Sequence, residues 1–297
     1  MRYYHVPFVV AWCLVQGQRA RGLSSVRPSV ASPARVSHSE VVIPGGPSGS
    51  RSDADADDGG GSTSSVGERL RSGESVLELR RLASPEECER LVEACLAHAA
   101  AATPTRQLDK PGLVRLPTVA AAGRAAVTNT PCADPLPPEV DRALGAVLRR
   151  TAEYVDRELP SVALVLFGAD SLAELMARER LKFSSREPAV NVYTEGGEFL
   201  AHKDAQALTV LLPLSRPGRD FAGGGTAFWH QDARGHRVEG PSAVLRPPAG
   251  TALLFGGCVT HAGVSVDGGS RVVFVASFSP ESHSIASEQR DIYGDSM

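Results

Sequence analysis

A histidine and a carboxylate stand two residues apart at His202 and Asp204. Side chains alternate along an extended chain, so these two project from one face of the backbone while Lys203 points away from it. An imidazole and a carboxylate placed in this way can both bind one metal ion. The pattern is weak by itself, because the His and Asp content of the chain makes a chance match of this kind common.

A second imidazole, His261, follows a glycine-rich segment further along the chain and opens the strand-like run HAGVSV. Two histidines and one carboxylate on one face of an iron ion leave coordination positions open for a chelating cosubstrate and for O2. The geometry is that of an oxygenase. The other histidines lie on a predicted helix, near the N-terminus or without a partner at useful spacing, and these are His98, His5, His38, His230, His236 and His283.

Arg271 begins the apolar segment RVVFVASF shortly after His261. Both faces of this segment are apolar or small, which predicts a buried strand. A guanidinium at the entrance to a buried strand must meet an anion or incur a large desolvation cost. Arg271 is therefore a candidate ligand for a carboxylate. A lone Arg at a strand end more often pairs with a local acid or with water, and that interpretation stays open.

The order of the motifs resembles that of a known family. The segment from Tyr193 to Asp204 reads Y-x-x-G-G-x-x-x-x-H-x-D, and it is followed by LTVLLPLS, DFAGGGTAFW, HAG and RVVFVASF. This series resembles the 2-oxoglutarate and Fe(II) dependent dioxygenases, and within them the prolyl and lysyl hydroxylase branch. The resemblance covers roughly residues 185–280, and more loosely the helical region from about residue 74.

The resemblance implies a double-stranded β-helix, also called a jelly roll, as the catalytic core. It implies that the metal ion is Fe(II) and that its ligands are His202, Asp204 and His261. It further implies that Arg271 binds the distal carboxylate of 2-oxoglutarate. Tyr193 matches a tyrosine that hydrogen-bonds the same cosubstrate in relatives, and Thr209 is expected to line its pocket.

The reaction implied by the resemblance is hydroxylation of a protein or peptide side chain with O2. It releases succinate and CO2 from 2-oxoglutarate, and ascorbate keeps the iron reduced. We expect a prolyl substrate, while lysyl and small-molecule hydroxylation stay open. Relatives that halogenate carry a small residue in place of the carboxylate, so Asp204 favours hydroxylation.

Three other functions are less consistent with the sequence. Nucleic-acid demethylases of the superfamily carry a second Arg where this chain has Ser277, and 31 basic against 34 acidic side chains produce no cationic field, so we expect no nucleic-acid partner. A cupin-like metal isomerase or hydrolase would share the barrel and the histidines, but would have no use for Arg271 and Tyr193 at these spacings. A binding module that has lost catalysis would not need the complete ligand set.

The positions of the β-type runs predict the fold that holds these residues. Short strand-like runs separated by Gly- and Pro-rich turns occupy residues 189–193, 208–214, 226–229, 242–245, 252–255, 262–266 and 271–278. Such a series predicts an antiparallel sandwich or barrel of the jelly-roll type. The chain is thus expected to be mainly β with helical support.

The helical support is expected before the strands. A strand is predicted from Val76 to Arg80, and Ser84-Pro85-Glu86-Glu87 has the N-cap, proline and glutamate of a helix start. Helical spacing of apolar residues predicts a second helix from about Pro138 to Leu159. Cys88 and Cys95 fall on the first helix, where they are expected to pack in the core rather than form a disulfide.

The remaining expectations concern domain organisation. Residues 74–285 are expected to form the dioxygenase domain, with helical support in 74–180, the β core in 181–280 and a tail in 286–297. Residues 1–39 contain Arg but no acid around a short apolar run, as in a targeting leader for the secretory pathway, the endoplasmic reticulum or another organelle. Residues 40–73 are rich in Gly, Ser and Asp and are expected to form a disordered linker. No apolar run reaches about 18 residues, so no stable membrane span is expected.

Overall fold

Antiparallel strands form the core of the structure, which is a computed structural model. It describes residues 35–43, 64–101, 111–127, 133–204, 206–230 and 239–281, all within one unit that begins at Arg35. Most of the expected leader and the whole expected tail lie outside these residues. Within them, no helix is both long enough and apolar enough to span a membrane.

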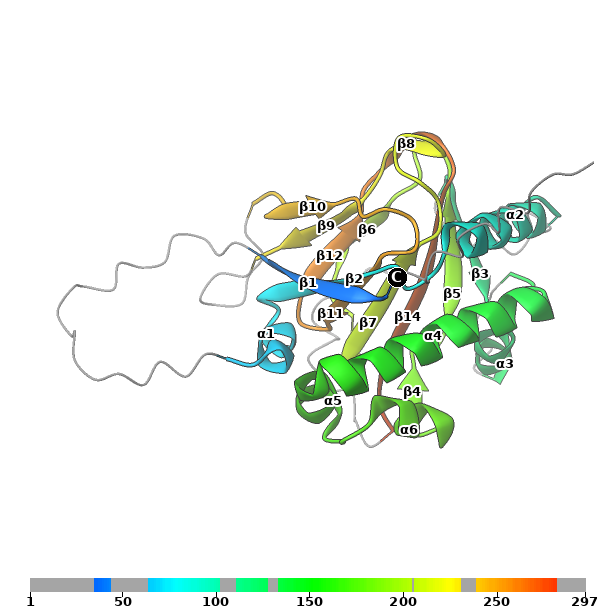
Figure 1. The fold of residues 1–297 in the computed structure, drawn as a ribbon. Helices are drawn as coiled ribbons and strands as arrows, with labels where there is room; N and C mark the ends of the chain where they lie inside the picture. Colours follow the sequence, from blue (N-terminus) through cyan, green and yellow to red (C-terminus); the bar gives the residue numbers. More distant parts are fainter. Residues whose placement is uncertain are drawn as a thin grey trace, which may run out of the picture. The chain divides into compact units, whose positions relative to one another are not determined.

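The strands form one large sheet and two smaller ones, and every named strand pair is antiparallel (Figure 1). The eight-stranded sheet contains, in spatial order, β1 (Ser37–Val42), β2 (Ser75–Arg80), β11 (Ala252–Gly256), β7 (Leu208–Pro213), β14 (Arg271–Pro280), β5 (Ala189–Tyr193) and β3 (Leu113–Pro117), with β4 (Leu181–Phe183) paired to β14. The four-stranded sheet contains β10 (Ala243–Leu245), β9 (Thr226–Trp229), β12 (Thr260–Gly263) and β6 (Phe199–His202). A two-stranded ribbon contains β13 (Val266–Gly269) and β8 (Phe221–Gly223).

The large sheet is buried on both faces, which explains why its central strands are mainly apolar. In β14, Val272 and Phe274 belong to the core cluster shared with the helices, whereas Val273 belongs to the cluster shared with the smaller sheets. Between the sheets, the rings of Phe228 and Phe255 meet edge to face with centroids 5.3 Å apart. The mainly β fold with a jelly-roll core of facing sheets is confirmed.

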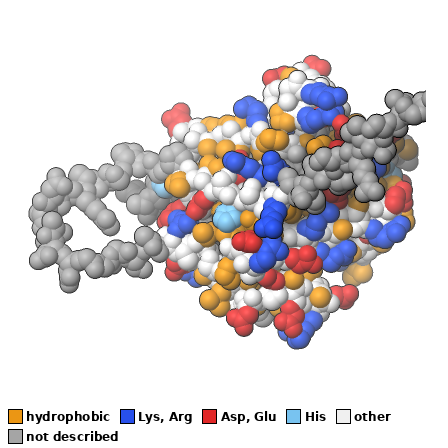
Figure 2. All heavy atoms as spheres, in the orientation of Figure 1, with side chains coloured by type: hydrophobic (Ala, Val, Ile, Leu, Met, Phe, Trp, Pro, Cys, Tyr) orange, Lys and Arg blue, Asp and Glu red, His pale blue; other side chains and the backbone are white. Residues whose placement is uncertain are grey.

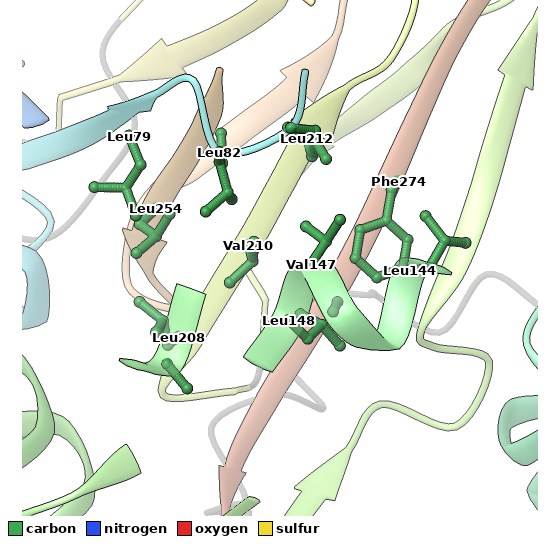
Figure 3. Packing of buried hydrophobic residues seen from close by; sticks show 14 of the residues in the cluster. Leu79, Leu82, Leu144, Val147, Leu148, Leu208, Val210, Leu212, Leu254 and Phe274 are labelled. Carbon is green, nitrogen blue, oxygen red and sulfur yellow. The ribbon is translucent and has the colours of Figure 1, made fainter. Parts of the chain in front are cut away.

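Helices cover the other face of the large sheet. They are α1 (Val66–Ser72), α2 (Pro85–Ala101), α3 (Val119–Val127), α4 (Pro138–Glu158), α5 (Pro160–Phe167) and α6 (Leu172–Ala177). The buried residues of α4 recur at helical spacing, and Leu144, Val147 and Leu148 point toward Val210 and Phe274 of the sheet (Figure 3). The predicted helices at Pro85 and at Pro138 are confirmed, and Cys88 and Cys95 are buried free thiols.

Two parts of the segment expected to be a linker are structured instead. Strand β1 overlaps it and pairs with β2 from Ser37 opposite Arg80 to Val42 opposite Ser75. Helix α1 begins with a capping box between Ser65 and Glu68. A helix this short is stabilised mainly by its packing, here against α5 and β11, which local composition does not reveal.

Other differences concern short elements. The run expected as one strand over 262–266 is divided between β12 and β13, which belong to different sheets. Strands β3, β4, β6 and β8 and helix α3 were not expected from the sequence. These elements are short, so their hydrophobic periodicity is weak and tertiary contacts decide their conformation.

Candidate metal centre

The three predicted metal ligands meet at one point. His202 ends β6 and lies directly opposite His261 of β12, and Asp204 follows two residues later. His202 Nε2 lies 3.4 Å from Asp204 Oδ1, and His261 Nε2 lies 3.6 Å from Asp204 Oδ2. Adjacent ligands on a six-coordinate ion with bonds of about 2.1 Å are separated by about 3 Å. The spacing therefore fits one metal ion, and no second group of three potential ligands meets elsewhere in the described part of the chain.

Backbone carbonyls orient both imidazole rings. His202 Nδ1 lies 2.8 Å from the carbonyl oxygen of Leu200, and His261 Nδ1 lies 3.3 Å from that of Val259. A carbonyl only accepts hydrogen bonds, so Nδ1 carries the proton and donates it in both rings. Both Nε2 atoms are thereby placed beside the Asp204 carboxylate, where they can bind one metal ion.

Two hydroxyl groups hold the Asp204 carboxylate. Thr209 Oγ1 donates to Asp204 Oδ2 at 2.5 Å, and Ser277 Oγ lies 3.4 Å from the same oxygen. Thr209 of β7 and Ser277 of β14 are opposite each other in the large sheet. Thr209 was expected in the cosubstrate pocket, but the structure places it behind the metal ligand, where it orients the carboxylate.

The protonation states of Asp204 and His261 suit metal binding. Burial favours the neutral form of Asp204, but the imidazoles of His261 and His202 and the Thr209 hydroxyl outweigh it, and the pKa of Asp204 is lowered. Burial lowers the pKa of His261 to about 4, so this ring is neutral at physiological pH. Burial opposes protonation of His202 as well, but its hydrogen bond and charge interaction with Asp204 prevail and raise its pKa, so a metal ion at Nε2 must displace a proton from this ring.

Arg271 is a buried cation at the start of β14. It is 3% exposed, its Nη2 donates to Thr226 Oγ1 at 3.1 Å, and its guanidinium carbon lies 5.1 Å from the centre of the Tyr193 ring. Burial lowers the pKa of Arg271. Among the described residues no carboxylate forms an ion pair with it, so a carboxylate ligand would offset its desolvation cost.

One narrow cavity connects the metal ligands with the guanidinium. Its walls include His202, Asp204, His261, Arg271, Tyr193, Thr226, Asn191, Leu211, Gly263 and Val275. A side chain at Gly224 would come within 3.1 Å of Arg271 Cδ, and the residue has a φ of +62°. A glycine in this turn therefore leaves room for the arginine at the end of the cavity.

Sequence reasoning missed the polar residues behind Tyr193. Asn191 Nδ2 donates to the Tyr193 hydroxyl at 3.2 Å, and Arg115 Nε donates to Asn191 Oδ1 at 2.9 Å. Asn191 could have been found, since it is the polar residue of an otherwise apolar run. Arg115 lies on the unexpected strand β3 and had no such signal.

A wider cavity of about 820 Å³ opens on the other side of His202 and Asp204. It shares Arg115, Glu187 and Phe199 with the narrow cavity and extends to α3 and to residues 182–186. Glu187 is buried, and its Oε2 accepts the backbone N–H of Ser277 at 2.7 Å while Oε1 accepts from Arg115 at 3.4 Å. The candidate metal centre thus lies between two cavities of different size.

The histidines that were set aside lie apart from this centre where they are described. His38 is hydrogen-bonded to the Tyr154 hydroxyl at 2.9 Å, and His98 lies 3.3 Å from the carbonyl oxygen of Asp134. The backbone N–H of His230 donates to Ser242. The other three, His5, His236 and His283, lie outside the described residues.

No protein-family model matches the chain, and no curated protein matches its sequence. Among solved structures it is similar to a viral collagen prolyl hydroxylase from Paramecium Bursaria Chlorella virus-1 in complex with 2OG, with 14% identity over 69% of this chain and 95% of that one and a TM-score of 0.41. It is similar to a prolyl-4-hydroxylase from Pseudomonas putida, with 13% identity over 72% and 97% and a TM-score of 0.44. A third is a rice dioxygenase for auxin oxidation, with 20% identity over 70% and 74% and a TM-score of 0.41. Two of these solved structures are prolyl hydroxylases and the third is a dioxygenase for auxin oxidation.

Proposed function

We propose that the protein is an Fe(II)- and 2-oxoglutarate-dependent dioxygenase that hydroxylates an unactivated carbon of its substrate. One observation carries the proposal. Two Nε2 atoms and a carboxylate converge at one end of a cavity whose other end holds the buried cation Arg271. This combination provides a metal site together with a site for a dicarboxylate that spans from the metal to the guanidinium.

In this proposal each residue has a defined task. His202, Asp204 and His261 would hold Fe(II), which together with 2-oxoglutarate and O2 supplies the oxidising chemistry that yields succinate, CO2 and the hydroxylated product. Arg271 binds the distal carboxylate of the cosubstrate and sets its orientation. Thr226 and Tyr193 hold the guanidinium in place, and Tyr193 is itself held by Asn191.

For the substrate, we propose a prolyl residue in a protein or peptide. The wide cavity supports this, because its walls combine apolar residues of α3, Ala120 and Val127, with the rings of Phe183 and Phe199. A cyclic aliphatic side chain fits such walls. Lysyl and small-molecule hydroxylation are the alternatives, and ascorbate is the proposed reductant.

The test of the activity is succinate release from 2-oxoglutarate by purified protein with Fe(II) and ascorbate. We expect release by the wild type and loss of both release and metal binding in Asp204→Ala. The control is Asp170→Ala, because Asp170 is exposed and lies outside both cavities. Metal binding or turnover that persists in Asp204→Ala would refute the ligand assignment.

We also propose that residues 1–39 act as a targeting leader for the secretory pathway or for an organelle. Their Arg content, their lack of acidic residues and their short apolar run support this. Determining the N-terminus of the mature protein tests it, since a leader that is removed would place that end beyond the apolar run. A mature protein that begins at Met1 would contradict removal.

A further inference from the structure

The wide cavity beside the metal ligands is lined by an excess of basic side chains. Its basic residues are Arg115, Arg124, Lys182, Arg186 and Lys203, and its acidic residues are Glu187 and Asp204. Both acids already have partners, since Glu187 accepts from Ser277 and Arg115 and Asp204 belongs to the candidate metal site. The whole chain has more acidic than basic residues, so this local excess does not follow from composition.

Two of these cations lie beside aromatic rings, and both donate hydrogen bonds to Glu187. The guanidinium carbon of Arg124 lies 5.6 Å from the centre of the Phe183 ring, and that of Arg115 lies 5.5 Å from the centre of the Phe199 ring. Burial lowers the pKa of Arg124, as expected for a partly desolvated cation. A cation in such surroundings attracts an anion more strongly than one in a solvated rim. Lys182, in contrast, is exposed, and an exposed lysine alone would not indicate a binding site.

Lys203 lies next to the candidate metal ligands in the chain and also belongs to the basic residues of the wide cavity, which we call the basic wall. This half-buried residue stands between His202 and Asp204 in the chain and forms part of the wall of the wide cavity. A molecule that reaches Lys203 and Arg124 therefore also lies against the metal ligands. Arg271, in contrast, lines the narrow cavity and not the wide one, so Arg124 and Lys203 are separate from the candidate cosubstrate cation.

We propose that the substrate carries a carboxylate, which Arg124 and Lys203 bind, close to the carbon that is hydroxylated. The inference rests on the proposed function and makes its substrate class more specific. The carboxylate can come from an acidic side chain next to a prolyl residue in a peptide, or from a free small molecule such as an amino acid. The chemistry that recognises it is the same in both cases.

The binding test uses benzoate and benzamide, which have the same ring and differ in charge. Each is titrated by calorimetry into protein saturated with Mn(II) and 2-oxoglutarate, so that Arg271 is already engaged. We expect benzoate to bind the wild type and benzamide to bind much more weakly. In the double variant Arg124→Gln and Lys203→Gln, benzoate affinity should fall at least about tenfold, as for the loss of charge-assisted hydrogen bonds.

The matched control for the binding test is Arg90→Gln, an exposed arginine on α2 outside both cavities, which should bind benzoate like the wild type. Any of three results would overturn the inference. They are equal affinities of the wild type for benzoate and benzamide, equal affinities of the wild type and the double variant for benzoate, and no binding of benzoate to the wild type. The preceding titrations with Mn(II) and 2-oxoglutarate report on the proposed function separately. If Mn(II) and 2-oxoglutarate do not bind but benzoate still binds in a way that depends on Arg124, the proposed dioxygenase activity is rejected while the carboxylate site in the wide cavity is retained.

Activity assays then identify the source of the carboxylate. Peptides of equal length with Glu, Gln or Lys beside a proline, and free L-proline with its amide, are compared by the gain of one oxygen in mass spectrometry. Faster modification of the Glu peptide assigns the carboxylate to a peptide side chain, and faster modification of L-proline than of its amide assigns it to a free acid. Equal or faster modification of the neutral or Lys-containing members would overturn the inference.

Discussion

At the scale of single residues, the candidate metal ligands and the groups that orient them are different residues. The two imidazoles are oriented by backbone carbonyls, whereas Asp204 is oriented by side chains of the large sheet. Side-chain supports can be removed one at a time without changing a ligand. The contribution of such a support to metal affinity is therefore measurable.

The first prediction concerns Thr209, whose hydroxyl donates to Asp204. Thr209→Val keeps the shape of the side chain but removes this hydrogen bond. We expect the affinity for Mn(II) or Fe(II) to fall by about 10- to 100-fold, as is typical when a group that orients a metal ligand is lost. Calorimetric titration measures it, with the exposed Thr194→Val as the control. An unchanged affinity would show that Asp204 does not depend on Thr209.

The second prediction concerns Arg271. Arg271→Ala removes a buried guanidinium from the narrow cavity, so we expect the KM for 2-oxoglutarate to rise by about tenfold or more, the cost of losing charge-assisted hydrogen bonds. Metal affinity should change little, because Arg271 contacts Thr226 and Tyr193 rather than the ligands. Arg219→Gln, at an exposed position, is the control. Equal losses of metal and cosubstrate binding would instead mean that Arg271 supports the fold.

At the scale of elements, the large sheet is the layer that positions the site. It lies between the helices and the smaller sheets, and its strands β7 and β14 carry Thr209, Ser277 and Arg271. The smaller sheet contributes His202 and His261 through β6 and β12. The metal ligands therefore meet the groups that orient Asp204, and face Arg271, only when the two sheets pack correctly.

The third prediction tests this packing at Phe274, a fully buried residue of β14 that faces α4 (Figure 3). Phe274→Ala should lower the free energy of unfolding by about 3 to 5 kcal/mol through lost burial and the cavity that remains. Leu164→Ala on α5, where Leu164 is 59% exposed, should change it by less than about 1 kcal/mol. Urea denaturation measures both. Similar values for the two variants would contradict the assignment of Phe274 to the core.

The fourth prediction compares two helical glycines. A Cβ at Gly67 of α1 would lie 2.2 Å from the carbonyl oxygen of Ser161 in α5, whereas a Cβ at Gly145 of α4 would meet only Arg149 Nη1 at 3.9 Å. Gly→Ala in a helix is normally stabilising by up to about 1 kcal/mol. We expect Gly145→Ala to raise the melting temperature and Gly67→Ala to lower it. A rise in both would show that α1 does not pack closely on α5.

At the scale of the whole molecule, charged side chains are dispersed over the surface, whereas two of the described thiols are buried in the core. Lys, Arg, Asp and Glu side chains are interspersed over the face shown in Figure 2. Burial raises the pKa of Cys88 to about 11 and that of Cys95 to about 12, while Cys258 is exposed. Protection of the first two thiols therefore reports on the integrity of the fold.

The fifth prediction follows from these thiols. Because the thiolate is the reactive form, iodoacetamide at pH 8 should modify Cys258 and leave Cys88 and Cys95 unmodified in the native protein. In denaturing urea all three should react. Peptide mass spectrometry after quenching distinguishes the sites. Native-state modification of Cys88 or Cys95 at the rate of Cys258 would contradict the burial of α2 against the core.

The sequence by itself determined the local parts of this protein. The alternation of an extended chain places His202 and Asp204 on one side, and the apolar runs predicted β5, β7, β9 and β14 with bounds close to those observed. The helical spacing of α4 was readable for the same reason, because a repeat over many residues leaves a strong local signal.

Tertiary structure alone decided which distant residues meet. The opposition of His202 and His261 depends on strand register, and the support of Asp204 by Thr209 and Ser277 depends on the pairing of β7 with β14. The basic wall around Arg124 brings together α3 and the chain next to β4 and β6, which no local pattern connects. Short elements such as α1 and β3 also form through long-range packing, since their few residues cannot offset the entropy cost of ordering by themselves.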